Sequence, residues 1–270
     1  MLNESRLLNF ISNNKKISLQ FFEGQKIIHD LALIHGVREQ GFSYFRDIVL
    51  STQPLMSLLK NNESFGIYID SELPYFRFKV EMNKLGQMRT LMLPAEFNEH
   101  PSEITGLCRL AKTTPGQQAP YTSIIELDKI NLKELTNHIL LKSYQIEGEV
   151  FISEFSDQSV LIKKLPVEEG EEVSVRQEWL KIQKEVINCF RAGHNNDEDI
   201  IKEIESLGYM YLGSQEARFK CNCSLDRMLT GIRSLARGDL DSVFEGSTEV
   251  EVKCDYCHKP YNINIKMLSH

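Results

Sequence analysis

Six cysteines are spread over the 270-residue chain, and four of them form two close pairs near its end. Cys221 and Cys223 are separated by one residue, Cys254 and Cys257 are separated by two, and thirty residues lie between the pairs. Thiolates are ligands that Zn²⁺ prefers, and four of them around one ion make a closed tetrahedral structural site. The spacing therefore predicts a single tetrahedral zinc site formed by these four cysteines.

The segment around the two pairs favours a fold that depends on a metal. Ser224 can cap a helix that continues to Leu235, and residues 250–253 and 261–265 can form a hairpin around the second pair. A segment of roughly fifty residues has little core of its own, so we expect a bound metal to stabilise its fold. Zinc in such small units supplies an apparent ~10–16 kcal/mol that is coupled to folding.

Other candidate ligands and thiols are weaker. His258 directly follows Cys257 and could compete as a ligand, but four thiolates already complete a tetrahedron. Cys108 and Cys189 are isolated, and Cys189 lies near the apolar face of an expected helix. We therefore expect both to be inert core residues. From spacing alone, a passive structural zinc site is favoured over redox sensing.

Two helices are expected between the cysteines and the rest of the chain. The acidic stretch Glu168–Glu172 (EEGEE) is turn-like and predicts a boundary before them. The first helix carries Val175, Trp179, Ile182, Val186 and Phe190 on one face, and the second, capped at Asn196-Asp197, carries Ile200, Ile201, Ile204 and Leu207 and stops at Gly208. These patterns predict a core domain at residues 1–167, a helical linker at 168–215 and a zinc domain at 216–270.

The first 165 residues mix strands with a few helices, which is typical of the α+β class. Strands are expected at residues 17–22, 65–70, 75–82, 87–93, 107–112, 121–127, 149–155 and 159–164, with helices at 27–37, 42–59 and 132–144. Pro54 should end or kink the second helix. Because Met1–Lys16 is polar, the first strand is expected at Ile17–Phe22. The predicted architecture is a mixed, sandwich-like core, a helical linker and a small C-terminal zinc-binding domain.

Charge and hydropathy limit the partners of the chain. The formal net charge of −7 disfavours a mainly electrostatic nucleic-acid binder, which needs a basic face. No apolar run approaches the ~20 residues that span a bilayer. The N-terminus lacks the apolar region of a signal peptide. We therefore expect a cytoplasmic protein that binds neither membrane nor nucleic acid.

Catalytic motifs are missing from the sequence. It contains no GxGxxG, P-loop, HExxH or GxSxG pattern. The histidines His29, His35, His100 and His138 are scattered without an obvious partner. A zinc hydrolase needs an open metal position, and four thiolates leave none. The sequence therefore predicts that the chain is not an enzyme.

The residues that flank the cysteines carry more specific information than the cysteine spacing alone. Arg218–Ser224 (RFKCNCS) and Val250–Tyr261 (VEVKCDYCHKPY), in a CxC, thirty-residue, CxxC layout, resemble the zinc domain of the heat shock protein 33 family of redox-regulated 33 kDa chaperonins. Leu207–Glu216 (LGYMYLGSQE) is similar to the approach to that domain. The resemblance implies a cytosolic holdase, independent of ATP, that binds unfolded or aggregation-prone client proteins. It also implies a core domain that binds clients and homodimerises on activation.

In this family the reduced, zinc-bound state is inactive. The resemblance implies that oxidation joins Cys221 to Cys223 and Cys254 to Cys257, releases zinc, and unfolds the zinc domain and linker to expose apolar surface. The chemistry of zinc thiolates is consistent with such a switch. Zinc holds each sulfur as the thiolate, which is the form that oxidants attack, and loss of the metal removes the folding free energy that it supplies. Short isolated helices are marginal in water, so an undocked linker should melt. The alternative is a structural zinc module that binds protein or nucleic acid without redox switching.

Overall fold

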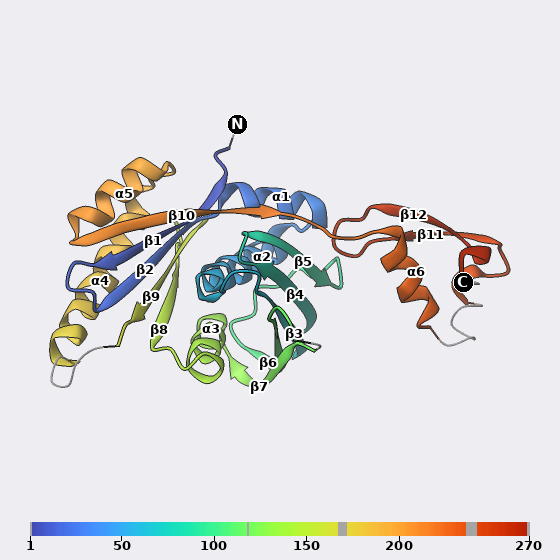
Figure 1. The fold of residues 1–270 in the computed structure, drawn as a ribbon, viewed down its shortest axis with the longest axis horizontal. Helices are drawn as coiled ribbons and strands as arrows, with labels where there is room; N and C mark the ends of the chain where they lie inside the picture. The colour runs from blue at the N-terminus through green and yellow to red at the C-terminus, as the bar shows by residue number, and fades with distance from the viewer. Residues whose placement is uncertain (1, 118, 167–171, 236–241, 269–270) are drawn as a thin grey trace. The chain divides into compact units, whose positions relative to one another are not determined.

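Alternating apolar residues in the first 219 positions build one large sheet. The computed structural model describes residues 2–117, 119–166, 172–235 and 242–268, and the chain separates into two units between Phe219 and Lys220. Within the described residues of the larger unit, ten strands hydrogen-bond in the order β7-β6-β3-β4-β5-β10-β1-β2-β9-β8 (Figure 1). All neighbours are antiparallel except β10 and β5, which run parallel.

The strands of this sheet are β1 (Ser5–Ser12), β2 (Ile17–Glu23), β3 (Ser64–Leu73), β4 (Tyr75–Asn83), β5 (Gln87–Leu93), β6 (Ile104–Thr113), β7 (Tyr121–Ile130), β8 (Gly148–Ile152), β9 (Gln158–Lys164) and β10 (Tyr209–Phe219). The predicted meander is β3-β4-β5, and the predicted strand pair near residues 149–164 is β8-β9. The α+β fold class is thus confirmed, with helices interspersed among strands of one sheet.

Helices of the first half cover one face of the sheet. They are α1 (Gln25–His35), α2 (Glu39–Thr52), which continues as a 3-10 turn (Gln53–Leu58), and α3 (Leu132–His138), which continues as a π turn (Ile139–Ser143). The helical stretch at 42–59 changes character next to Pro54, as predicted, because proline cannot donate the backbone hydrogen bond of a continuing α-helix. Their apolar faces form the main core with side chains such as Phe22, Phe45 and Phe78.

The predicted linker helices cover the other face of the sheet. They are α4 (Glu172–Ala192) and α5 (Asp197–Ser206), and they lie beside β1, β2 and β9 (Figure 1). Strand β2 is buried on both faces because Ile17, Leu19 and Phe21 point toward these helices, whereas Phe22 belongs to the main core. Four residues of the stripe that the sequence predicted on α4 are buried there, with Val175, Ile182, Val186 and Phe190 at most 4% exposed, and the fifth, Trp179, is partly buried.

Two expectations differ from the structure. The first strand is β1 rather than the expected Ile17–Phe22, which lies in β2, and Leu7, Leu8 and Phe10 of the N-terminal segment are fully buried. Its partners β2 and β10 supply the apolar setting, and β10 lies some two hundred residues away, so local polarity concealed the strand. Residues 209–215 of the predicted helical linker are also strand, the first part of β10. The division at 168 and 216 stays a prediction, and most of the acidic turn at 168–172 lies outside the described residues.

The smaller unit has only a small apolar core among its described residues. It contains α6 (Leu225–Arg233), a hairpin of β11 (Glu249–Lys253) and β12 (Pro260–Asn264), and a 3-10 turn (Ile265–Leu268). Ser224 caps α6 by accepting a hydrogen bond from the backbone N–H of Arg227 at 3.3 Å, as its position predicted. Its buried apolar cluster consists of Leu229, Ile232, Phe244 and Ile263. In the described part of the chain no helix combines the length and apolarity that crossing a membrane requires.

Candidate metal centre

The hairpin and the start of α6 bring the four paired cysteines together. Cys221 and Cys223 lie in the loop before α6, Cys254 directly follows β11, and Cys257 lies in the turn before β12. All four Sγ atoms lie within 4.8 Å of one another. This cluster of four cysteines, the residues that the sequence singled out, can hold a metal ion.

Two sulfur–sulfur contacts join one motif to the other. Cys221 Sγ lies 3.7 Å from Cys254 Sγ, and Cys223 Sγ lies 3.4 Å from Cys257 Sγ. Cys254 is 3% exposed, and the other three are half-buried. His258, the alternative ligand, is not part of the group. Its backbone N–H donates to the Cys254 carbonyl at 2.7 Å and so helps close the CxxC turn.

Hydrogen bonds make the four sulfurs unequal. Burial alone would raise the pKa of the Cys223 thiol, but hydrogen bonds from the Tyr261 hydroxyl and from the neighbouring thiols outweigh it and lower that pKa to about 7. Burial raises the pKa of Cys257 to about 12, and it also raises the pKa of Cys221. Tyr261 was not singled out from the sequence, although its position four residues after Cys257, on the strand that leaves the turn, could have indicated it.

The two isolated cysteines lie in the cores of the larger unit. Cys108 on β6 is fully buried and Cys189 on α4 is 6% exposed. Burial raises the pKa of each thiol to about 12, so neither is poised as a thiolate near neutral pH. This agrees with the expectation that both are inert core residues.

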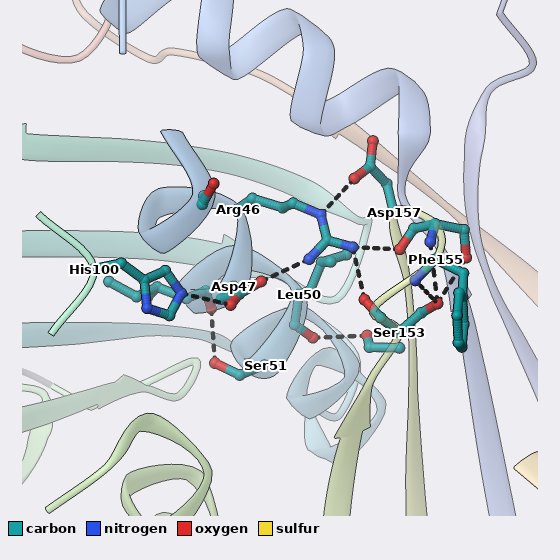
Figure 2. Close-up of polar contacts among 12 residues, drawn as sticks. Arg46, Asp47, Leu50, Ser51, His100, Ser153, Phe155 and Asp157 are labelled. Atoms are coloured by element: carbon teal, nitrogen blue, oxygen red, sulfur yellow. Dashed lines mark hydrogen bonds and ion pairs between the residues drawn. The ribbon is translucent and has the colours of Figure 1, made fainter. Parts of the chain in front are cut away.

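Histidines of the larger unit have partners that the sequence did not reveal. His100 Nε2 lies 3.0 Å from an Asp47 carboxylate oxygen, and His35 Nε2 lies 2.9 Å from Thr90 Oγ1. Asp47 also accepts from Arg46, whose guanidinium donates to Asp157 at 2.7 Å and to backbone carbonyls of the β8-β9 turn (Figure 2). This network joins α2 to the turn, so we interpret His100 as a structural residue.

The fold and the cysteine cluster together define a protein in which a four-cysteine, metal-binding unit follows a larger α+β unit. The family model described as Hsp33 protein matches residues 5–264. The chain therefore belongs to the Hsp33 family.

Individual relatives are distant. A 33 kDa chaperonin of Limosilactobacillus fermentum is 25% identical over 174 residues, which cover 62% of this chain and 59% of the relative. One of Prochlorococcus marinus is 29% identical over 161 residues, covering 54% of this chain and 53% of the relative. The matched region is thus less than two thirds of these proteins. The crystal structure of a 33 kDa chaperonin (heat shock protein 33 homologue) of Thermotoga maritima aligns with a TM-score of 0.76 at 12% identity, covering 98% of this chain and 97% of that one, and shows the same fold.

Proposed function

We propose that the chain is a redox-regulated, ATP-independent holdase that binds unfolding proteins in the cytoplasm under oxidative stress. It has no enzymatic activity in this proposal. The reduced, zinc-bound state is inactive, and oxidation activates the chaperone. The four-sulfur cluster is the observation that carries the proposal, since it joins a redox-sensitive donor set to a unit with a small core.

The donor set fits Zn²⁺. Zinc–sulfur bonds of about 2.3 Å in a tetrahedron place neighbouring sulfurs about 3.8 Å apart. The sulfur contacts of 3.7 and 3.4 Å, within a group spanning 4.8 Å, are close to that arrangement. When bound, zinc supplies folding free energy and holds the sulfurs as thiolates. Cys221, Cys223, Cys254 and Cys257 would be its ligands.

Oxidation should dismantle this site. The resemblance assigns the disulfides Cys221–Cys223 and Cys254–Cys257, which would replace the contacts that now join the two motifs. Among the described residues of the smaller unit, the buried apolar cluster is small and consists of Leu229, Ile232, Phe244 and Ile263. A unit with so little core is expected to lose its fold when the metal's contribution is lost.

The apolar face beneath α4 and α5 gives the activated state a client-binding surface. Leu8, Phe10, Leu19, Phe21 and Ile162 of the sheet are at most 2% exposed because these helices cover them. The chain runs from α5 through β10 directly to Cys221, so unfolding that begins at the cysteines reaches the linker by chain continuity. Melting of the linker would expose both the sheet face and the helix stripes.

Metal content tests the proposal. Wild-type protein purified under reducing conditions should hold about one zinc per chain, and peroxide should release it. Cys221→Ser should bind zinc much more weakly, whereas the control Cys189→Ala, which removes a buried thiol outside the cluster, should keep it. Full zinc content in Cys221→Ser would contradict the site. Zinc that resists peroxide while every sulfur stays reduced would favour a structural zinc module without redox switching.

A further inference from the structure

The hydroxyl of Tyr261 lies against one sulfur of the cluster. Tyr261 Oη donates a hydrogen bond to Cys223 Sγ at 3.1 Å. Tyr261 is the second residue of β12, and its register opposite Val252 of β11 fixes its backbone beside the cysteines. The contact is therefore built into the hairpin.

Two of the other sulfurs accept hydrogen bonds from backbone N–H groups rather than from a side chain. Cys221 accepts from the backbone N–H of Cys223, and Cys257 accepts from the backbone N–H of Lys259. Those donors are backbone groups of the turns that form the site. The donor to Cys223 is the side-chain hydroxyl of Tyr261, which a single substitution can remove. The Lys259 ammonium also lies 5.4 Å from the centre of the Tyr261 ring. A cation over the ring holds it in place and draws electron density from it, which strengthens the hydroxyl as a donor.

A hydrogen bond to a thiolate withdraws charge from sulfur and makes it a weaker nucleophile. We propose that Tyr261 is a positioning residue that selectively shields Cys223 from electrophiles, and so raises the oxidant dose needed to open the site. This inference rests on the proposed redox function for its consequence, but the shielding itself is a property of the zinc-bound, reduced protein. Groups outside the ligand set commonly tune metal sites in this way.

The chemical step that Tyr261 slows is attack of sulfur on a peroxide. The Cys223 sulfur gives an electron pair to one oxygen of hydrogen peroxide, the O–O bond breaks, and the other oxygen leaves as water after taking a proton. The resulting sulfenic acid is attacked by Cys221, which forms the S–S bond and releases the second water. Two thiolates, one hydrogen peroxide and two protons from the solvent thus give one disulfide and two waters.

Tyr261→Phe in the full-length, zinc-loaded chain tests the inference. Iodoacetamide alkylation in the absence of oxidant, followed at each cysteine by mass spectrometry, measures nucleophilicity directly. We expect alkylation of Cys223 to be about fivefold faster than in wild type, the rate equivalent of about 1 kcal/mol for one hydrogen bond, with smaller changes at Cys254 and Cys257. Tyr75→Phe is the control, because it deletes the same atom from an exposed tyrosine of the larger unit.

The pattern over the cysteines separates the outcomes. Equal acceleration at all four cysteines, with a lower thermal midpoint, would mean that Tyr261 only supports the hairpin and would overturn the inference, as would an unchanged Cys223 rate. Lys259→Met keeps the hydroxyl and removes the cation, so a smaller acceleration confined to Cys223 is expected, and it serves as the test if Tyr261→Phe does not fold. Peroxide-driven zinc release is measured separately: if wild type never releases zinc, the redox function fails while the alkylation pattern still decides the role of Tyr261.

Discussion

Glu23 should make the stability of the larger unit depend on pH. It ends β2 and is only 4% exposed. Its pKa is raised from 4.5 to about 7: burial is the largest cause, a hydrogen bond from the Gln25 N–H lowers the pKa, and the nearby carboxylates of Asp157 and Asp197 raise it. The surrounding cations are already engaged, since Arg6 pairs with Asp197 at 3.4 Å and Arg46 pairs with Asp157 at 2.7 Å.

The direction of the pH dependence follows from the number of protons that the folded and unfolded states bind. Between pH 4.5 and 7 the folded unit keeps a proton on Glu23 that the unfolded chain has lost, so the stabilising contribution is complete below about 4.5 and is lost as pH rises to about 7. The rise of the Glu23 pKa corresponds to a loss of about 3 kcal/mol in the free energy of unfolding as pH increases, of which about 2 kcal/mol is lost between pH 5.5 and 7. Glu23→Gln mimics the protonated carboxyl and should remove this dependence.

Urea unfolding between pH 4 and 8.5 measures the effect. Trp179, the only tryptophan, lies on α4 and packs against the apolar cluster between the sheet and helices α4 and α5, so its fluorescence reports on these two helices. Glu23→Gln should be similar to wild type near pH 4 and about 3 kcal/mol more stable at pH 8. Glu103→Gln, which changes an exposed carboxyl, should run parallel to wild type. Parallel curves for wild type and Glu23→Gln would refute the reasoning.

Two further substitutions test the packing of the larger unit. Arg46→Met should lower the free energy of unfolding by about 3 kcal/mol, because it leaves the Asp157 carboxylate without its partner; a loss below about 1 kcal/mol in urea titrations would contradict this. Gly86→Ala should cost about 2–4 kcal/mol, because φ is +74° and an added Cβ would lie 1.7 Å from the Glu216 carbonyl oxygen. Gly116→Ala, at φ +83° with open space around it, should cost only about 1 kcal/mol, and equal thermal midpoints for the two variants would show that the close contact is not limiting.

The cysteine cluster could be predicted because its signal is local. Cys221 with Cys223, and Cys254 with Cys257, are close in sequence, and the described residues between the two pairs include α6 and the hairpin strand β11, which have clear patterns. The contribution of Tyr261 was not visible in the same way. Its hydroxyl reaches Cys223 across 38 positions, which depends on how the hairpin folds back on the loop.

Long-range pairing limited the prediction of the larger unit. β1 contains Arg6 and Asn9 among its apolar residues and is stabilised by β10, far along the chain, so local polarity was misleading. The same applies to Glu23 and Arg46, whose partners come from separate elements. The linker helices were predicted because the pattern of buried residues is contained within each helix: the predicted stripe 175–190 lies within α4, and α5 begins directly after the predicted cap at Asn196.

Client protection by the reduced and oxidised forms tests the central proposal most directly. Light scattering follows the thermal aggregation of an unrelated client protein, without ATP, in the presence of reduced zinc-loaded protein or of protein treated with peroxide until zinc is released. The oxidised form should suppress aggregation at near-stoichiometric ratios, and the reduced form should not. Equal protection by both forms would contradict the redox switch, and protection by neither would contradict the holdase function.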